Sequence, residues 1–334
     1  MPIIVGLVFS QLQADLPISC PKQFCRRYSG YIPLIPPEFR ICSECHIEME
    51  LYNKYGAPFS YRTTNDPNYP VIPYGVHQQY LCKPHLDQHA VYDVFFVICS
   101  SAAEFERRED LRKRLATIGR HYNVGYMFVL GSNITVDAGV RRESRNHRDI
   151  LQLAHTDSYH HITLSVFGAL QFLAGYNEIA RYFMKTDSDC VYNIPRIVQT
   201  AQQVIRAYIG NCRYLDYYIT KKRHLKMAVP EQLIQKDTKI PPYATGAGYL
   251  IHSSILPHLV VALRHLNFIA HNEDVNIGKA FHLLNRNCTM EDQWVARSGC
   301  MSREDCLEYA VIHKNTSDFE LAPIWEMVMS SLKK

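Results

Sequence analysis

Two aspartates separated by one residue could bind a divalent metal ion in this protein. Asp187 and Asp189 lie in residues 186–189, which follow directly after a short, mainly apolar run of strand length at residues 182–185. Ligands bind at the carboxyl ends of strands in open α/β sheets, and paired carboxylates repel each other there unless a cation lies between them. Their hard oxygen atoms favour a divalent metal. The alternative is an ordinary surface turn, because Asp-x-Asp also occurs by chance.

Two glycines flanked by aromatic residues form a second candidate site. Gly246 and Gly248 lie between Tyr243 and Tyr249. Glycine lets the backbone approach a ligand closely, and a tyrosine ring could stack on the apolar face of a sugar. The alternative is a tight turn into a strand at residues 249–251, in which glycine only supplies a positive φ.

Two adjacent acids could supply a general base. Glu273 and Asp274 begin a helical pattern that continues to Leu284. Acids at a helix N-terminus are favoured by capping and by the helix dipole alone, which is the alternative explanation. A functional carboxylate at this place would take the proton from an incoming hydroxyl group.

The sequence holds eleven cysteines, five of them before residue 90. Their clustering in a stretch rich in Pro and Tyr is typical of disulfide cross-linking, which is the default interpretation. Cys42, Cys45 and His46 also match the c-type haem attachment pattern, and they could bind zinc with Cys20 and Cys25. A metal- or haem-binding protein built on these cysteines is therefore an alternative of a different class.

Three N-glycosylation sequons, at Asn133, Asn287 and Asn315, favour the secretory pathway together with the cysteines. A membrane-spanning helix needs about 20 apolar residues, and the apolar run at residues 2–9 is too short. This run lacks the basic segment of a signal peptide. It is interpreted as a buried strand, a weak signal peptide or the remnant of an anchor.

The composition is that of an ordinary globular protein. The chain has 334 residues, of which 47% are hydrophobic and 20% charged, and this excludes wholesale disorder. Its formal net charge of +4 is too balanced for a protein that binds nucleic acid. The length suits about two domains, or one large domain with an extension.

Alternating strand and helix patterns begin at Tyr92. Residues 94–99 and 126–131 are apolar runs typical of strands covered on both faces, and residues 104–118 between them have helical spacing. This order predicts an α/β sheet. Further helices are predicted at residues 158–182, 193–208, 254–266 and 273–284, and the charged run at residues 141–149 is expected to be a solvated loop or helix end.

Taken in sequence order, segments between Val94 and Trp325 resemble the β-1,3-galactosyltransferase family, which also includes β-1,3-N-acetylglucosaminyltransferases. Residues 185–189, Lys-Thr-Asp-Ser-Asp, stand where the family has Lys-x-Asp-Asp-Asp. Residues 157–164, Asp-Ser-Tyr-His-His-Ile-Thr-Leu, are similar to its Asp-x-Tyr-x-Asn-Leu-Thr-Leu stretch. The other similar segments are residues 108–112, 128–131, 143–150, 242–249, 273–278 and 311–325. Each motif is weak alone, but their shared order is specific.

The resemblance implies a GT-A fold, an α/β domain with a Rossmann-like nucleotide-binding half and a mixed central sheet flanked by helices. This catalytic domain would span residues 91–330, after an extension or stem rich in Cys, Pro and Tyr at residues 1–90. The implied reaction transfers galactose or an N-acetylhexosamine from a UDP-sugar to a glycan hydroxyl in β-1,3 linkage, with inversion and with Mn²⁺ as cofactor. The implied location is the Golgi lumen, where such enzymes are usually membrane-anchored, although no anchor is recognised in this sequence.

The resemblance also assigns roles to individual residues. Asp187 and Asp189 would face the metal and the ribose-diphosphate, with Asp189 the more direct ligand and His313 completing the metal site. Asp274, with Glu273 as second candidate, would take the proton of the acceptor hydroxyl. The residues expected to bind the donor are Arg108, Arg112, Lys185, Asp187, Gly246, Gly248 and Tyr249.

Two departures from the family pattern bear on donor choice. Ser188 replaces the middle acid of the triplet, and residues 113–118 lack the Trp that usually follows the first arginine motif. Neither departure removes a proposed catalytic group. They motivate an alternative reading, a catalytically degenerate member of the same fold that binds glycans without turnover.

Overall fold

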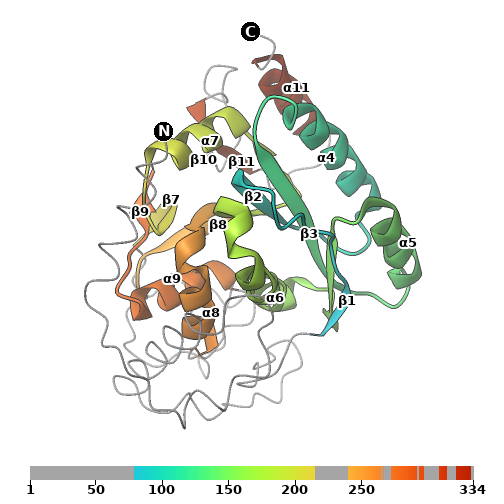
Figure 1. The fold of residues 1–334 in the computed structure, drawn as a ribbon, viewed down its shortest axis with the longest axis horizontal. Helices are drawn as coiled ribbons and strands as arrows, with labels where there is room; N and C mark the ends of the chain where they lie inside the picture. Colours follow the sequence, from blue (N-terminus) through green and yellow to red (C-terminus); the bar gives the residue numbers. More distant parts are fainter. Residues whose placement is uncertain are drawn as a thin grey trace, which may run out of the picture.

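An eight-stranded mixed sheet forms the centre of the computed structural model (Figure 1). The structure describes residues 79–214, 240–264, 266, 272–291, 293–296, 308–313 and 321–331. The strands of this sheet, in spatial order, are β1 (Tyr80–Cys82), β4 (Ile150–Thr156), β3 (Val124–Ser132), β2 (Tyr92–Cys99), β5 (Ala180–Asp187), β8 (Tyr243–His252), β7 (Tyr208–Arg213) and β9 (Thr289–Met290).

The parallel part of the sheet has a Rossmann-like order. Strands β4, β3, β2 and β5 run parallel, and the chain passes from β2 to β3 and β4 on one side before β5 returns to the other side of β2. Cys99 at the end of β2 lies opposite Asp187 at the end of β5. Because the strand order reverses between β2 and β5, the crevice beyond their carboxyl ends is where such a sheet binds ligands.

The rest of the sheet is mainly antiparallel and continues into a small second sheet. Strand β8 pairs antiparallel with both β5 and β7. The second sheet has the order β10 (Val295–Ala296), β11 (Val311–His313) and β6 (Cys190–Tyr192). Its strand β6 starts directly after the β5 turn, so this sheet meets the main sheet at the same carboxyl edge.

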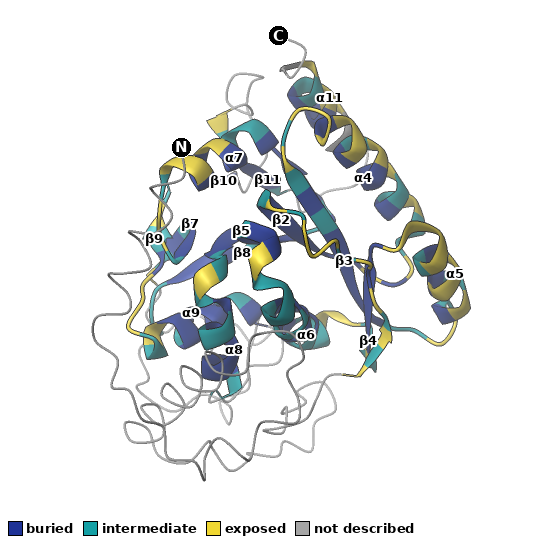
Figure 2. Cartoon of the chain, in the orientation of Figure 1, coloured by how far each residue is buried: buried dark blue, intermediate teal, exposed yellow. Residues whose placement is uncertain are grey.

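Two helical layers cover the main sheet. On one face lie α4 (Phe105–Ile118), α5 (Asp137–His147), α7 (Ile194–Gln203) and α11 (Leu321–Ser331), and on the other lie α6 (Ile162–Leu173), α8 (Leu256–Arg264) and α9 (Glu273–Leu283) (Figure 1). The apolar side chains of β2 point alternately into the two layers, which explains its continuous apolar run. Figure 2 shows the strands buried between these helices.

The predicted α/β class and the first strand–helix–strand unit are confirmed, but two helices are shorter than predicted. The helix expected at residues 158–182 is α6 between two 3₁₀ turns, Tyr159–His161 and Ala174–Ile179, and β5 already begins at Ala180. The helix expected at residues 193–208 ends at Gln203, and the predicted cap is present because the Asn193 side chain accepts a hydrogen bond from the backbone of Arg196.

Two other regions differ in part from their expectations. The charged run at residues 141–149 forms the end of helix α5, one of the two forms expected for it, and most of it is exposed, but Glu143 and Asp149 are buried because two arginines pair with them. Gly246 and Gly248 lie inside strand β8 rather than in a turn before it. A Cβ at Gly248 would come within 2.8 Å of Val311 Cγ2, so close packing of the two sheets requires glycine here.

A disulfide between Cys212 and Cys288 ties the end of β7 to the residue before β9. The stem predicted at residues 1–90 lies almost wholly outside the described residues, as does the Cys42–Cys45 motif, so both stay predictions. The described part of that stretch includes β1, which pairs antiparallel with β4. Among the described residues, no helix combines the length and the apolar character needed to cross a membrane.

Removing the disulfide should destabilise the fold. It closes a loop with a sequence separation of 76 residues, for which chain entropy predicts a stabilisation of about 4 kcal/mol. The double variant C212S/C288S should therefore unfold at a lower urea concentration than the wild type, and reducing agent should lower the midpoint of the wild type more than that of the variant. The control C82S, which changes a free thiol, should unfold like the wild type. Equal midpoints for all three proteins would contradict this prediction.

Candidate functional site

The acidic pair predicted from sequence lies at the carboxyl edge of the sheet. Asp187 is the last residue of β5, Asp189 lies in the turn that follows, and Cys190 is the first residue of β6. The register of β5 with β8 puts Lys185 opposite Tyr249 and Thr186 opposite Gly248. The aspartates are thereby brought next to the glycines of β8.

Lys185 is a buried cation that joins three elements. Its Nζ lies 2.9 Å from Asp187 Oδ1 and 2.7 Å from Glu273 Oε1, and it donates a hydrogen bond to the carbonyl oxygen of Gly246 at 2.6 Å. The side chain is 1% exposed. Burial alone would lower the pKa of Lys185, but the two carboxylates raise it well above its usual value. The ammonium group therefore holds β5, β8 and α9 together.

The two acids at the start of α9 have different surroundings. Glu273 is buried, faces Lys185 and accepts a hydrogen bond from the Tyr249 hydroxyl at 2.9 Å. Burial raises the pKa of Glu273 to about 7, against the opposing charge of Lys185. Asp274 is only partly buried, and its two oxygens accept from the backbone N–H groups of Gly246 at 3.3 Å and Val275 at 2.9 Å. Burial raises the pKa of Asp274 as well. Asp274 is thus the acid more open to an incoming group.

Gly246 allows this cluster to close. A Cβ at this position would lie 2.8 Å from Glu273 Oε1, 3.6 Å from Lys185 Nζ and 3.7 Å from Asp274 Oδ2. Any side chain would therefore push the acids away from the lysine. The requirement is close approach between groups of the protein itself, whereas the sequence suggested approach to a ligand.

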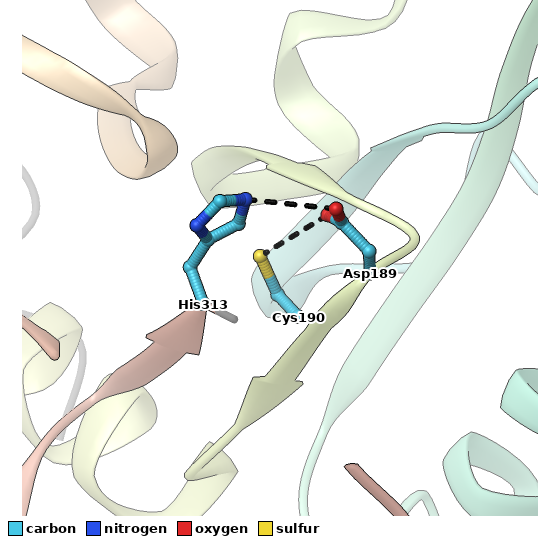
Figure 3. Close-up of side chains that lie close together, drawn as sticks. All are labelled: Asp189, Cys190 and His313. Carbon is cyan, nitrogen blue, oxygen red and sulfur yellow. Dashed lines mark hydrogen bonds and ion pairs between the residues drawn. The ribbon is translucent and has the colours of Figure 1, made fainter. Parts of the chain in front are cut away.

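Asp189, Cys190 and His313 form a second cluster, drawn in Figure 3. His313 Nε2 lies 3.6 Å from Asp189 Oδ2, and Cys190 Sγ lies 3.9 Å from Asp189 Oδ1. A hydrogen bond and the charge of Asp189 raise the pKa of His313. Burial acts to raise the pKa of Asp189, but His313 outweighs it and the pKa is lowered. A carboxylate, an imidazole and a thiol, all of which can bind a metal ion, thus converge here.

The backbone of β8 connects the two clusters. The carbonyl oxygen of Gly246 accepts from Lys185, while that of the next residue, Ala247, accepts from the Thr186 hydroxyl at 2.8 Å and the Cys190 thiol at 3.5 Å. The sequence-predicted residues Lys185, Asp187, Asp189, Gly246, Gly248, Tyr249, Glu273, Asp274 and His313 therefore occupy one edge of the fold. Acids outnumber bases among them, which gives this edge an affinity for cations.

Glu104, which the sequence analysis missed, joins the carboxyl ends of β2 and β5. Its Oε2 accepts hydrogen bonds from the Ser100 hydroxyl at 3.1 Å, the Ser101 backbone N–H at 3.0 Å and the Ser188 hydroxyl at 2.9 Å. Arg107 pairs with its other oxygen at 2.9 Å. Ser188, which replaces the family's middle acid, thus donates a hydrogen bond to the carboxylate of Glu104 from a distant part of the sequence. No local sequence signal links residues 104 and 188.

Arg108 and Arg112 lie behind the crevice in buried ion pairs. Arg108 contacts Glu143 at 2.7 Å and donates to the carbonyl oxygens of Ser101 at 2.6 Å and Ala102 at 3.1 Å. Arg112 contacts Glu143 and Asp149, each at 2.8 Å. The guanidinium groups are thereby engaged with protein groups, and Arg108 fixes the loop that follows β2. Direct donor binding by these arginines stays a prediction.

The buried position of Tyr249 corrects the expectation that its ring stacks on a sugar. The ring is 0% exposed and packs edge-on against Tyr208, while its hydroxyl is directed at Glu273. Tyr243 is buried as well.

Cys190 is the second site residue that was not predicted from the sequence. Its position directly after Asp189 is the one feature of the sequence that could have indicated it.

The chain is similar in sequence to known beta-1,3-galactosyltransferases. Beta-1,3-galactosyltransferase 1 of Mus musculus and of Homo sapiens are each 24% identical over 241 residues, a match that covers 66% of this chain and 72% of the relative. Beta-1,3-galactosyltransferase 4 of Mus musculus is 26% identical over 194 residues, covering 48% of this chain and 52% of the relative.

Solved glycosyltransferases align with most of the chain, at low identity and with low TM-scores. The galactosyltransferase LgtC, in complex with donor and acceptor sugar analogues, is 10% identical with a TM-score of 0.40, covering 71% of this chain and 95% of LgtC. These scores are low, so the family assignment depends on the sequence. A sequence model described as galactosyltransferase matches residues 106–288, more than half of the chain, from α4 to the disulfide-bonded Cys288. On this evidence, the chain belongs to the galactosyltransferase family.

Proposed function

We propose that this protein transfers a hexose, galactose or an N-acetylhexosamine, from a UDP-sugar to a glycan hydroxyl in β-1,3 linkage, with inversion at the anomeric carbon. The observation that carries the proposal is the continuous edge formed by Asp274, Lys185, Asp187, Asp189 and His313, beyond the carboxyl ends of β2 and β5. Family membership supports the reaction class. The specific donor, linkage and stereochemistry are proposed from the resemblance.

The residues of this edge fit a divalent metal such as Mn²⁺. Carboxylate and imidazole are suitable ligands for such an ion, and Asp189 and His313 offer one of each, 3.6 Å apart. Asp187 is less available as a direct ligand because Lys185 contacts its Oδ1. When bound, the metal neutralises negative charge on the departing diphosphate. Asp189 and His313 would hold it there.

Asp274 is proposed as the general base. Its carboxylate would accept the proton of the acceptor hydroxyl while the oxygen of that hydroxyl attacks the anomeric carbon from the side opposite the UDP group. One base suffices for this single displacement, because no covalent sugar–enzyme intermediate is formed. Glu273 is committed to Lys185 and Tyr249, so we propose it as a positioning residue that keeps Lys185 charged and in place.

Tyr159 is proposed as the aromatic residue that contacts the sugar, in place of the buried Tyr249. It is 37% exposed and lies in the segment before α6. Burial, reinforced by the charges of Asp274 and Asp187, raises the pKa of Tyr159, which is consistent with a position beside the two acids. An exposed tyrosine at this place offers an apolar face and a hydroxyl group to a hexose.

A location in the Golgi lumen is proposed from three features. The described residues contain one disulfide, Cys212–Cys288, which is stable in an oxidising compartment. Asn287 is exposed beside it, and in the sequon at Asn133 the residues Ile134 and Thr135 are exposed. Sequons on the surface are open to glycosylation in the secretory pathway. The resemblance supplies the Golgi in particular.

Replacing the proposed base should remove turnover but leave the fold intact. D274N should lower kcat by about 10²–10⁴-fold, since Asn keeps the shape but cannot accept the proton. Release of UDP, measured with Mn²⁺ and a panel of UDP-sugars, is the assay, and E326Q at an exposed position of α11 is a charge-matched control that should retain activity. Full activity of D274N would refute the base assignment. Glycan binding by the wild type with no UDP release from any donor would support the degenerate alternative.

Titration of Glu273 should appear in the pH dependence of stability. Its folded pKa of about 7 lies above the ordinary 4.5, so its contribution to stability is complete below pH 4.5 and is lost as pH rises through 7. The thermal stability of the wild type relative to E273Q should therefore fall between about pH 5 and pH 8. Glu143 should behave in the opposite way, because its arginine partners outweigh burial and lower its pKa. The thermal stability of the wild type relative to E143Q should therefore decrease as pH falls below about 4.5. If the melting temperatures of the wild type and E273Q differ by the same amount at every pH in this range, the pKa of Glu273 is not raised.

Restoring the family's middle acid should harm this protein. S188D would put a second carboxylate against Glu104, at a position where the serine hydroxyl now lies 2.9 Å from Oε2. Like charges about 4 Å apart cost roughly 1–4 kcal/mol near a protein surface. S188D should thus unfold at lower urea concentration and bind UDP more weakly by calorimetry, and the second change in E104Q/S188D should recover much of the loss. An S188D protein as stable as the wild type would show that this contact is unimportant.

A further inference from the structure

Cys190 is a third candidate metal ligand beside Asp189 and His313. Cys190 and His313 are directly opposite each other in the antiparallel pair of β6 and β11, so their side chains project from the same face. Asp189 precedes Cys190 in the turn. The nearest ligand atoms of the three residues all lie within 4.8 Å of one another. Figure 3 shows the imidazole and the thiol on the same side of the carboxylate, each joined to it by a dashed line.

The spacing of these atoms suits a small tetrahedral ion. Zinc binds sulfur, nitrogen and oxygen at about 2.0–2.3 Å, which corresponds to ligand–ligand edges of roughly 3.3–3.8 Å in a tetrahedron. His313 Nε2 lies 3.6 Å from Asp189 Oδ2, Cys190 Sγ lies 3.9 Å from Asp189 Oδ1, and one ligand atom from each of the three residues lies within 4.8 Å of the others. Side-chain movements of about 1 Å would bring the three ligand atoms to these edges.

We propose that Cys190 makes this site receptive to thiophilic divalent cations, namely Zn²⁺, Cd²⁺ and Co²⁺. The inference depends on the proposed function for the metal site itself and adds a ligand and a class of competing ions to it. Thiolate ligands favour zinc over manganese, and the intrinsic affinity series of divalent metals runs in the same direction. These ions would thus displace Mn²⁺ at the site and inhibit transfer.

The surroundings of Cys190 permit the thiol to be used in this way. Cys190 is buried and its Sγ now donates to the carbonyl oxygen of Ala247 at 3.5 Å; ligation would release that proton. The carbonyl group would not be left without a partner, because the Thr186 hydroxyl also donates to it at 2.8 Å. Among the free thiols of the described residues, Cys82 and Cys99 are not members of this metal-ligand cluster.

Absorbance of the cobalt-loaded protein tests the proposal. The whole 334-residue chain is used with the substitutions C42S and C45S, since that motif could bind metal itself, and Co²⁺ is titrated in. A thiolate-to-cobalt charge-transfer band should saturate at one ion per chain, persist in C82S and disappear in C190V, a substitution suited to a buried strand. Absence of the band, or its survival in C190V, overturns the proposal.

A second measurement needs no substitution at Cys190. A cadmium NMR resonance of the parent chain in the position typical of mixed sulfur, nitrogen and oxygen ligation supports the proposal, and one typical of oxygen and nitrogen alone overturns it. Mn²⁺-dependent UDP release is assayed in parallel. If the protein releases UDP but shows no charge-transfer band, Cys190 is not a metal ligand and the proposed function still holds. If the band is present but no donor gives UDP release, Cys190 is a metal ligand and the proposed function is wrong. Zn²⁺ should inhibit the parent at a concentration at least about tenfold lower than it inhibits C190V.

Discussion

The ammonium group of Lys185, buried between Asp187 and Glu273, is the interaction on which the rest of the site depends. Four acids lie along this edge, and without a fixed cation among them their mutual repulsion would open the junction of β5, β8 and α9. A buried charge is stable only when it is paired, so the lysine and the acids require each other. Gly246 is part of the same constraint, because its lack of a side chain lets the groups come into contact.

Two further networks hold the loop after β2 against this edge. Glu104 collects three hydrogen bonds from the ends of β2 and β5, while Arg108 binds the carbonyl groups of Ser101 and Ala102 from below. Both residues belong to the start of α4, so one helix fixes the crevice from the side of the sheet. The first arginine of the family's motif, Arg108, therefore has a structural role in this chain: it fixes the shape of the loop after β2.

The site is divided into two functional parts by a short stretch of β8 backbone. Gly246 faces the acids proposed for proton transfer, and Ala247 faces the thiol of the candidate metal site. Neighbouring carbonyl groups in a strand point to opposite sides, which is how one strand can serve both parts. Movement of β8 would therefore change both parts together, and the packing of Gly248 against Val311 and the bond from Trp294 limit such movement.

The sequence by itself determined the α/β class, the first strands and the order of the acidic and glycine motifs, because apolar periodicity and local residue types are properties of short segments. It could not determine that Glu143 and Asp149 are buried, that Tyr249 is covered, or that Glu104 meets Ser188, since each depends on contacts between distant segments. Only the tertiary structure decided which charges are neutralised and which are open to a ligand. The physical reason is that desolvation and ion pairing depend on neighbours in space. The sequence does not distinguish an Asp or Arg that is buried in an ion pair from one that is exposed.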